Sequence, residues 1–217
     1  MGNIFRFSEF LKIYESKEGD DPDQPTTSEP AADPEIVRPD MLDIQPAKRF
    51  NLPHTEQGLP TIKDGVKYDL PDDQTLKSKL MKLVGEKEFN NFAKSCEDIG
   101  LPIQIALRQL WTESGFNPKA RSASGAKGLA QFMPISWPSY GKGNPFNPVN
   151  SLKAYVKLMN ELINKKFPKR LDLALAGYNW GPNRGVLKNA LTNEMDFSDI
   201  QKQLRGETRK YVHKILA

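Results

Sequence analysis

A single carboxylate, that of Glu113, stands at the end of an apolar helical stretch, where the chain changes abruptly into a turn-rich loop. The apolar residues before it recur at i, i+4, i+7 and i+8, the spacing of one helical face. They are Ile103, Leu107, Leu110 and Trp111. Apolar neighbours disfavour the charged form of a carboxyl and raise its pKa toward neutrality, so that one group can both donate and accept a proton. The position therefore suits a general acid–base, although a surface glutamate at a fraying helix end has the same pattern.

Four motifs follow one another from this point: ESGFNP (113–118), SASGAKGLAQFMP (122–134), LALAGYNWGP (173–182) and ETRKYV (207–212). Their order and content resemble the lytic transglycosylases, in particular the soluble-type catalytic domain related to goose-type lysozyme. The resemblance is dense over residues 101–191, thinner toward the C-terminus, and does not reach the first seventy residues. It implies an all-α fold, a compact helical domain of the mainly α branch of the lysozyme-like α+β superfamily.

The resemblance also implies a reaction that needs one acid. Glu113 would protonate the glycosidic oxygen between N-acetylmuramic acid and N-acetylglucosamine in peptidoglycan glycan strands. It would then take the proton of the muramic acid C6 hydroxyl, which closes a 1,6-anhydro ring. Glycosidases usually require a second carboxylate, but between residues 101 and 182 the only other acidic residues are Glu161 and Asp172. Glu161 lies in a stretch expected to be solvated, and neither residue lies in a loop suited to a cleft.

Further substrate-binding residues are carried over from the resemblance. They are Ser122, Ser124, Gln131, Met133, Ser136, Tyr178, Asn179 and Tyr211. Gln131 and Met133 match positions that line the cleft near the scissile bond. Tyr178, Asn179 and Tyr211 match positions beside the acid. Ser122 and Ser124 match substrate-contacting hydroxyls, and Ser136 matches a position where threonine or serine is usual. Each also has a purely structural interpretation, because serine and glycine form turns while methionine and tyrosine fill helix packing. Gly125 and Gly128 are expected to permit tight turns.

Three residues depart from the usual pattern of the family: Ala130, Gly177 and Trp180. We expect the small side chains at positions 130 and 177, together with the bulky side chain of Trp180, to reshape a substrate subsite. Hydrolysis by water, as in goose-type lysozymes, competes with ring closure as the expected reaction. Two further hypotheses are a peptide-bridge endopeptidase and a non-catalytic virion or wall-binding protein with the same fold. The retained Glu113, Gln131 and Tyr178 argue against the non-catalytic protein.

Metal and cofactor chemistry is not indicated by the composition. Cys96 is the only cysteine, and the two histidines, His54 and His213, lie far apart in the sequence, so ligands for zinc or a Cys–His pair are too few. No cofactor is expected. No run approaches the roughly 18 apolar residues of a membrane span, and the N-terminus lacks the pattern of a secretory signal. Arg6 stands where a myristoylation signal requires serine or threonine.

Charge divides the chain of 217 residues into three parts. Residues 1–16 are neutral overall and predict an amphipathic docking helix over residues 4–14, whose expected partner is a virion component or a membrane surface. Residues 17–71 predict an acidic, proline-rich linker, in which residues 17–43 carry a net charge of −7. Residues 72–217 predict the catalytic domain. Since the whole chain is +4, residues 44–217 carry +11; this suits an anionic polymer, but no nucleic-acid recognition signature is present.

Hydrophobic periodicity and capping residues predict the helices of residues 72–217. One starts at Asp72 or Asp73 and is interrupted near Gly85, and another stops at Gly100. The third is the helix of Glu113, with Pro102 at its first helical position. The next predicted helices run from Asn147-Pro148 to Phe167, from Lys169 to Tyr178, from Pro182 onward and over Glu207 to Leu216. No alternating strand is expected, although a short hairpin after Glu113 would not be visible in the pattern. Delivery by a virion would bring the enzyme to periplasmic peptidoglycan, and a specialised secretion system is the alternative route.

Overall fold

The computed structural model describes Val66 and residues 68–217, so the predicted docking helix (residues 1–16) and most of the predicted linker lie outside the described residues. Within the described part the chain forms helices, turns and isolated β-bridges but no strand, which confirms the all-α prediction. No helix there has both the length and the apolarity to cross a membrane. The helices are α2 (Asp73–Val84), α3 (Glu86–Asp98), α4 (Ile103–Ser114), α5 (Trp137–Tyr140), α6 (Pro148–Glu161), the π-helix η1 (Leu162–Lys166), α7 (Leu171–Trp180), α8 (Gly185–Thr192), α9 (Phe197–Ile200) and α10 (Gly206–Leu216).

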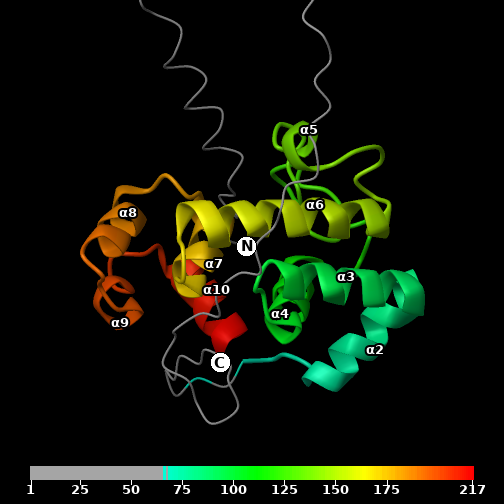
Figure 1. The fold of residues 1–217 in the computed structure, drawn as a ribbon, viewed down its shortest axis with the longest axis horizontal. Helices are drawn as coiled ribbons and strands as arrows, with labels where there is room; N and C mark the ends of the chain where they lie inside the picture. The colour runs from blue at the N-terminus through cyan, green and yellow to red at the C-terminus, as the bar shows by residue number, and fades with distance from the viewer. Residues whose placement is uncertain (1–65, 67) are drawn as a thin grey trace, which may run out of the picture.

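The first three helices form one side of the domain (Figure 1). The side chain of Asp72 caps α2 by accepting a hydrogen bond from the backbone N–H of Thr75 at 2.8 Å, and Gly85, with φ +84°, separates α2 from α3. Pro102 is the N-cap of α4 rather than its first helical residue. The buried face of α4 is also rotated from the predicted stripe: Ile103 and Trp111 are half-buried, whereas Ile105, Ala106 and Gln109 join Leu107 and Leu110 in the core.

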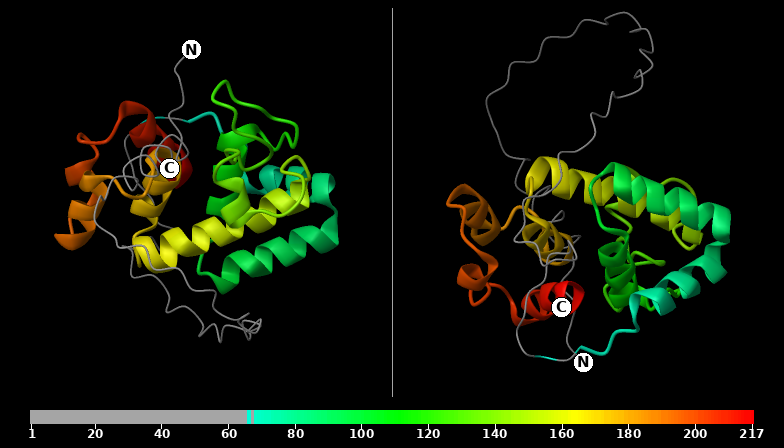
Figure 2. Two further views of the ribbon diagram at one scale, coloured as in Figure 1. Left: turned by 90° about the horizontal axis from the view of Figure 1, so that it is seen from above. Right: turned by 60° about the horizontal axis from the view of Figure 1, so that its bottom comes forward.

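α6 crosses the domain and separates the α5 segment from the other helices (Figures 1 and 2). As predicted, Asn147 caps it, accepting from the backbone N–H of Asn150 at 3.1 Å. The predicted single helix to Phe167 is wrong in its last turn, where the backbone widens into η1 and the N–H of Phe167 donates to the carbonyl of Leu162 at 2.8 Å. This wider turn places both Ile163 and Phe167 in the core.

α7 lies at the centre of the domain. Residues 171–179 are all buried. Apart from Asp172 and Asn179, the run LDLALAGYN is apolar or small around the whole helix, and such a helix must be covered on every side. α10 packs against α7 and α4, and Figure 2 shows α10 running beside both helices. The C-terminal helix thus reaches back to the end of α4, where Glu113 lies.

Three predictions of the helix pattern needed correction. The helix predicted from Lys169 starts at Leu171, because Lys169 takes a positive φ of 62° that ends the preceding turn. The helix predicted from Pro182 starts at Gly185, after a turn. The four-residue helices α5 and α9 were not predicted; α9 is held by a capping box between Asp196 and Asp199.

Candidate active site

Glu113 is the penultimate residue of α4, and its side chain is half-buried. The helix ends on Gly115, whose φ of +60° is left-handed. Ser114 follows the acid directly, and its hydroxyl donates to the carbonyl oxygen of Leu129 at 2.7 Å. Trp111 and Phe116, on either side of the acid in sequence, pack edge to face with ring centroids 5.3 Å apart. The end of the helix is therefore fixed to the following loop, with aromatic side chains nearby as the sequence predicted.

The carboxylate of Glu113 meets Tyr211 of α10. The Tyr211 hydroxyl donates a hydrogen bond to Glu113 Oε1 at 2.7 Å, across 98 residues of sequence. Burial raises the pKa of Tyr211 well above its usual value, and the negative charge of Glu113 raises it further. The phenol consequently stays protonated and remains a donor to the carboxylate throughout the neutral pH range. The structure brings these two predicted residues into direct contact.

The loop over residues 115–136 is built from turns. Two isolated antiparallel bridges, Arg121 with Lys127 and Lys127 with Phe132, take the place of a regular hairpin. Gly125 and Gly128 have φ angles of +89° and +75°, as expected for tight turns. Gly128 has a second reason to be glycine, because a Cβ there would lie 2.1 Å from the carbonyl oxygen of Pro145.

Gln131 faces into this loop. It is buried, has a positive φ of 53°, and its Nε2 donates to the carbonyl oxygens of Gly128 at 2.8 Å and Ala120 at 3.3 Å. The amide thus braces the loop from inside. Substrate contact by Gln131 stays a prediction, and its bracing role is one that the sequence did not indicate.

Tyr178 of α7 supports the same loop. Its hydroxyl donates to the carbonyl oxygen of Ala130 at 2.7 Å, and the backbone N–H of Ala130 donates to the hydroxyl of Ser151 on α6 at 3.1 Å. Both contacts are buried. A residue next to Gln131 is therefore held from two helices.

Asn179 has a different connection. Its side-chain oxygen accepts a hydrogen bond from the Thr208 hydroxyl at 2.8 Å, inside the domain. Thr208 lies three residues before Tyr211 on α10, so this bond fixes α7 to the helix turn that presents Tyr211. The structure thus gives Asn179 a role in placing the tyrosine.

The remaining predicted residues lie along the loop. The Ser122 hydroxyl accepts from the backbone N–H of Ala126 at 2.9 Å, and Ser124 is half-buried in the same turn. Ser136 is buried and donates to the carbonyl oxygen of Met133 at 3.1 Å, while the Met133 side chain is half-buried. Their substrate contacts stay predictions, and the structure places the two buried or bonded serines, Ser122 and Ser136, in local turns.

Both other acidic residues of the motif region have partners. The carboxylate of Glu161, expected to be solvated, is instead half-buried and accepts from the Tyr140 hydroxyl at 2.9 Å. Asp172 is buried and forms a two-bond ion pair with Arg170, at 3.0 and 2.7 Å. Asp172 is thereby explained as a partner of Arg170 at the start of α7.

Two buried residues near the acid were not predicted from the sequence. Gln109 lies one helical turn before Glu113, is fully buried, and accepts a hydrogen bond from the hydroxyl of Tyr155 at 2.8 Å. The Tyr155 ring in turn packs against Tyr178 with centroids 6.0 Å apart. The i−4 spacing of a polar residue on the face of the acid was the available signal, whereas Tyr155 could not be distinguished from the core residues of its helix.

The reshaped subsite expected from the three departures stays a prediction, and the structure shows what surrounds each residue. Ala130 is fully buried. A Cβ on Gly177 would lie 2.7 Å from the Phe167 ring, so that ring occupies the space of the missing methyl group. Only Trp180 is partly exposed, with the Arg184 guanidinium 5.0 Å from its ring centroid.

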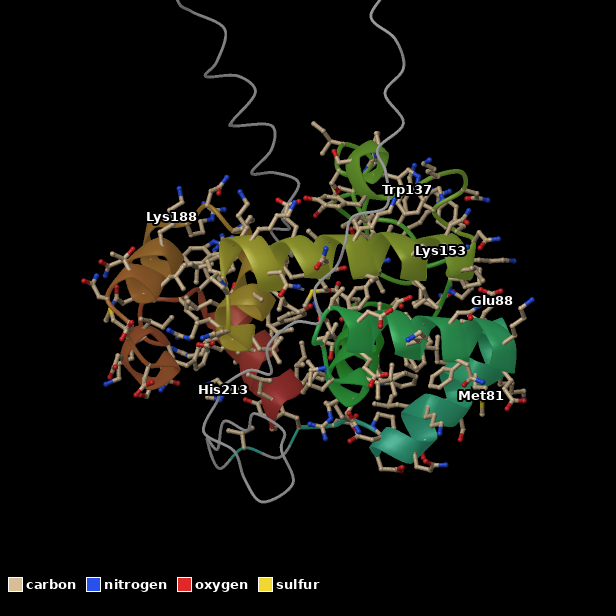
Figure 3. The ribbon with its side chains drawn as sticks, in the orientation of Figure 1. Met81, Glu88, Trp137, Lys153, Lys188 and His213 are labelled. Atoms are coloured by element: carbon tan, nitrogen blue, oxygen red, sulfur yellow. The ribbon has the colours of Figure 1, made fainter. Side chains whose placement is uncertain are left out.

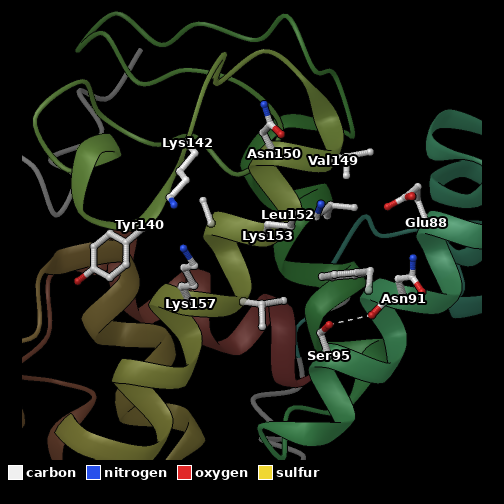
Figure 4. Close-up of a pocket in the computed structure, with 13 residues that line it drawn as sticks. Glu88, Asn91, Ser95, Tyr140, Lys142, Val149, Asn150, Leu152, Lys153 and Lys157 are labelled. Atoms are coloured by element: carbon white, nitrogen blue, oxygen red, sulfur yellow. Dashed lines mark hydrogen bonds between the residues drawn. The ribbon is translucent and has the colours of Figure 1, made fainter. Parts of the chain in front are cut away.

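A separate groove of about 300 Å³ lies between α3 and α6, away from Glu113 (Figure 4). Figure 3 shows Glu88 and Lys153 on the two facing helices. Its apolar lining includes Phe92 and Leu152, and Lys142, Lys153 and Lys157 also line it. Among the described residues no group of three His, Cys, Asp or Glu side chains is placed to hold a metal ion.

The candidate site thus consists of a half-buried glutamate at the end of α4 and a tyrosine from the C-terminal helix, set in a helical domain. The model of the family described as the transglycosylase SLT domain matches residues 90–201, which is more than half of the chain. The chain belongs to this family. The match includes Glu113 and every other predicted site residue except Tyr211.

Individual relatives agree with this assignment. A putative soluble lytic murein transglycosylase of Haemophilus influenzae is 28% identical over 137 residues, covering 58% of this chain and 23% of the relative. Membrane-bound lytic murein transglycosylase D of Escherichia coli is 28% identical over 179 residues, covering 72% of this chain and 38% of the relative. Peptidoglycan transglycosylase gp16 of Escherichia phage T7 is 29% identical over 133 residues, covering 58% of this chain and 10% of the relative. The matched part is thus well under half of each relative.

The fold has a solved counterpart. The crystal structure of the 70 kDa soluble lytic transglycosylase of Escherichia coli superposes with a TM-score of 0.50 at 24% identity, over 66% of this chain and 26% of that chain. The likeness establishes the lysozyme-like helical fold.

Proposed function

We propose that this chain cleaves the β-1,4 bond between N-acetylmuramic acid and N-acetylglucosamine in peptidoglycan, with Glu113 as its single general acid–base. The observation that carries the proposal is the Glu113–Tyr211 pair: a half-buried carboxylate at a helix end, hydrogen-bonded at 2.7 Å to a buried tyrosine. Membership of the transglycosylase SLT domain family supports the substrate class.

The reaction requires two proton transfers at one carboxyl group. Protonated Glu113 donates to the glycosidic oxygen as the bond to C1 of the muramic acid breaks. The resulting carboxylate then accepts the proton of the C6 hydroxyl, whose oxygen bonds to C1 and closes the 1,6-anhydro ring. The acid ends in its starting form. General acid–base assistance of this kind contributes about 10²–10⁴-fold.

The absence of a free second carboxylate in the motif region favours ring closure. A glycosidase that uses a nucleophile or a base needs a second carboxyl group about 5–9.5 Å from the acid. Glu161 is hydrogen-bonded to Tyr140 and Asp172 is paired with Arg170, both on other elements than the end of α4. With the sugar hydroxyl as internal nucleophile, neither is required.

Mass spectrometry of muropeptides released from purified sacculi tests the proposal. We expect 1,6-anhydromuramoyl ends. Reducing muramoyl ends would establish hydrolysis by water, and cleaved peptide stems would establish an endopeptidase. Intact sacculi would favour a non-catalytic wall-binding protein with this fold.

We further infer that the enzyme is carried by a phage particle, which would deliver it to the periplasmic wall. Similarity to the phage T7 peptidoglycan transglycosylase supports this, as does the amphipathic pattern predicted for residues 1–16, which suits docking to a virion component. Detection of the chain in purified virions would establish it. Its absence from particles of a phage that encodes it would contradict it.

A further inference from the structure

The acid is connected to a buried polar side chain whose position the reaction itself does not explain. Gln109 is 0% exposed, and its carboxamide lies on α4 one turn before Glu113. Burying an amide group without hydrogen-bond partners is costly, because its interactions with water are lost and not replaced. Packing would be served as well by leucine or methionine at this position, so a glutamine here needs an explanation.

The orientation of this amide is determined by Tyr155. The Tyr155 hydroxyl donates to Gln109 Oε1 at 2.8 Å. Tyr155 is itself fully buried, with its ring between Phe92 and Tyr178 at centroid distances of 6.1 and 6.0 Å. The carbonyl end of the amide therefore faces Tyr155, and the N–H₂ end is turned away from it.

The N–H₂ end makes no hydrogen bond by distance and angle to any described residue. Tyr211 is its neighbour on this face of α4, because α10 packs on α4 and the Tyr211 hydroxyl lies 2.7 Å from Glu113 Oε1, one turn after Gln109. In agreement with this placement, Gln109 lowers the pKa of the Tyr211 phenol, against the larger rise caused by burial and by Glu113. A lowering is the sign expected when an N–H faces a phenolic oxygen. The contact between the Gln109 N–H₂ group and the Tyr211 oxygen falls short of a hydrogen bond in the free protein, and hydrogen bonds in active sites are often long or poorly aligned until substrate binds.

We propose that Gln109 is a positioning residue that keeps the hydroxyl proton of Tyr211 directed at Glu113. With an N–H₂ group facing the phenolic oxygen, the Tyr211 proton has no acceptor on that side and must point to the carboxylate. If the amide were reversed, its carbonyl would compete with Glu113 for that proton. Donors and acceptors are thus ordered from α6 to the acid, through the side chains of Tyr155, Gln109, Tyr211 and Glu113 in turn.

The inference rests on the proposed role of Glu113, but a titration tests it without any activity. A hydrogen bond donated to a carboxylate stabilises its charged form and lowers its pKa, so loss of that bond raises the pKa. Titratable groups near the acid include Tyr211 on α10 and Tyr155 on α6, whose pKa values the charge of Glu113 raises; Tyr178 on α7 acts on both tyrosines, and Cys96 on α3 acts on Tyr155. The pKa values of Tyr211, Tyr155 and Cys96 are raised, chiefly by burial, so none of these three titrates between about pH 3 and pH 9.

The experiment is a carboxyl ¹³C NMR titration of the full chain, with the Glu113 signal assigned by its loss in Glu113→Gln. We expect Tyr211→Phe to raise the pKa of Glu113 by about half to one unit, and Gln109→Met to raise it by a similar or smaller amount. In the Tyr211→Phe background, Gln109→Met should add nothing, because its effect acts through the Tyr211 hydroxyl. Gln104→Met is the control, because Gln104 is half-buried on the same helix; this substitution should not change the pKa of Glu113.

An unchanged Glu113 pKa in Gln109→Met, or an equal rise in the Tyr211→Phe background, would overturn the proposal. If Gln109→Met does not fold, Tyr155→Phe replaces it, since it leaves the amide in place and frees it to reverse; a rise is expected, and no rise would overturn the proposal. A wild-type chain that fails to cleave sacculi refutes the proposed function alone, because the titration is read independently. Where cleavage is seen, the alkaline limb of its pH profile should move upward in Gln109→Met.

Discussion

Glu113 and Glu161 each accept a hydrogen bond from a tyrosine, at 2.7 Å from Tyr211 and at 2.9 Å from Tyr140. Both carboxylates are half-buried and both lie at or near the end of a long helix. In both pairs burial and the negative charge of the glutamate raise the pKa of the tyrosine, with burial the largest cause. Viewed as isolated pairs, the two sites are closely similar.

The surroundings of the two pairs differ. Tyr211 is 7% exposed and belongs to an eleven-residue helix that packs on α7 and α4 and is fixed by the bond between Thr208 and Asn179. Tyr140 is half-buried and belongs to the four-residue α5. Glu113 adjoins a loop that is braced by Gln131 and by Tyr178, whereas α6 continues past Glu161 into η1. A tyrosine partner alone therefore does not distinguish the proposed acid from Glu161; the two sites differ in how firmly the surrounding elements hold the tyrosine.

The largest expected effect separates the two carboxylates directly. Glu113→Gln should abolish cleavage of sacculi while preserving the fold, because glutamine is nearly isosteric and still accepts from Tyr211 but cannot transfer a proton. A loss of about 10²–10⁴-fold corresponds to about 3–5 kcal/mol of barrier. Turnover of labelled sacculi and a thermal melt measure the two properties.

Glu161→Gln is the matched control and should retain activity. Wild-type-like turnover in Glu113→Gln would refute the assignment of the acid. Loss of activity in a folded Glu161→Gln would instead make a two-carboxylate hydrolase the better interpretation.

The next effect separates the two tyrosines. Tyr211→Phe should lower kcat/KM about tenfold, since a hydrogen bond to a charged group is typically worth about 1.5–3 kcal/mol and part of this is lost at the acid. It should also move the alkaline limb of the pH profile upward, because the carboxylate loses a donor that favours its charged form. Tyr140→Phe removes the same chemical group from Glu161 and should change neither quantity. Equal effects of the two substitutions would remove the distinction between the sites.

The sequence predicted the fold class, the caps at Asp72 and Asn147, and the end of α4 at the acid, because these depend on local periodicity and on capping chemistry. It missed η1 and the late start of α7, where tertiary packing around Phe167 and a positive φ at Lys169 decide the backbone. Short helices such as α5 carry too few residues for a periodic pattern.

Within the candidate site, the contact of Tyr211 with Glu113 followed from resemblance alone, because nothing local relates residues 98 positions apart. The internal positions of Gln131 and Gln109 could not be predicted, since a polar side chain in a sequence does not reveal whether it faces substrate or braces the chain. The sequence also did not reveal which residue packs against Gly177. The fold brings the Phe167 ring into the space that a methyl group at position 177 would occupy.

A smaller effect is expected when support is removed from the loop beside Glu113. Tyr178→Phe deletes the hydroxyl that donates to the buried carbonyl of Ala130, and an unsatisfied buried group costs about 1–3 kcal/mol. We expect a lower melting temperature and a several-fold loss of turnover. Tyr140→Phe, which removes a hydroxyl that donates to Glu161 instead, is the control for the substitution itself. A Tyr178→Phe protein with unchanged stability would show that the Ala130 carbonyl finds another donor.

The smallest effect is expected from removing the N-terminal region, which contains neither Glu113 nor Glu161. Residues 17–43 carry a net charge of −7 and five prolines, a composition that disfavours a packed core. The core of the described domain starts at Leu76. A fragment that starts at Lys63 should therefore cleave sacculi like the full chain, with the same helical circular dichroism and the same loss on Glu113→Gln. If the fragment keeps its helical spectrum but loses activity, residues 1–62 contribute to catalysis or to wall binding, and the acid at the end of α4 would not be sufficient with its present neighbours alone.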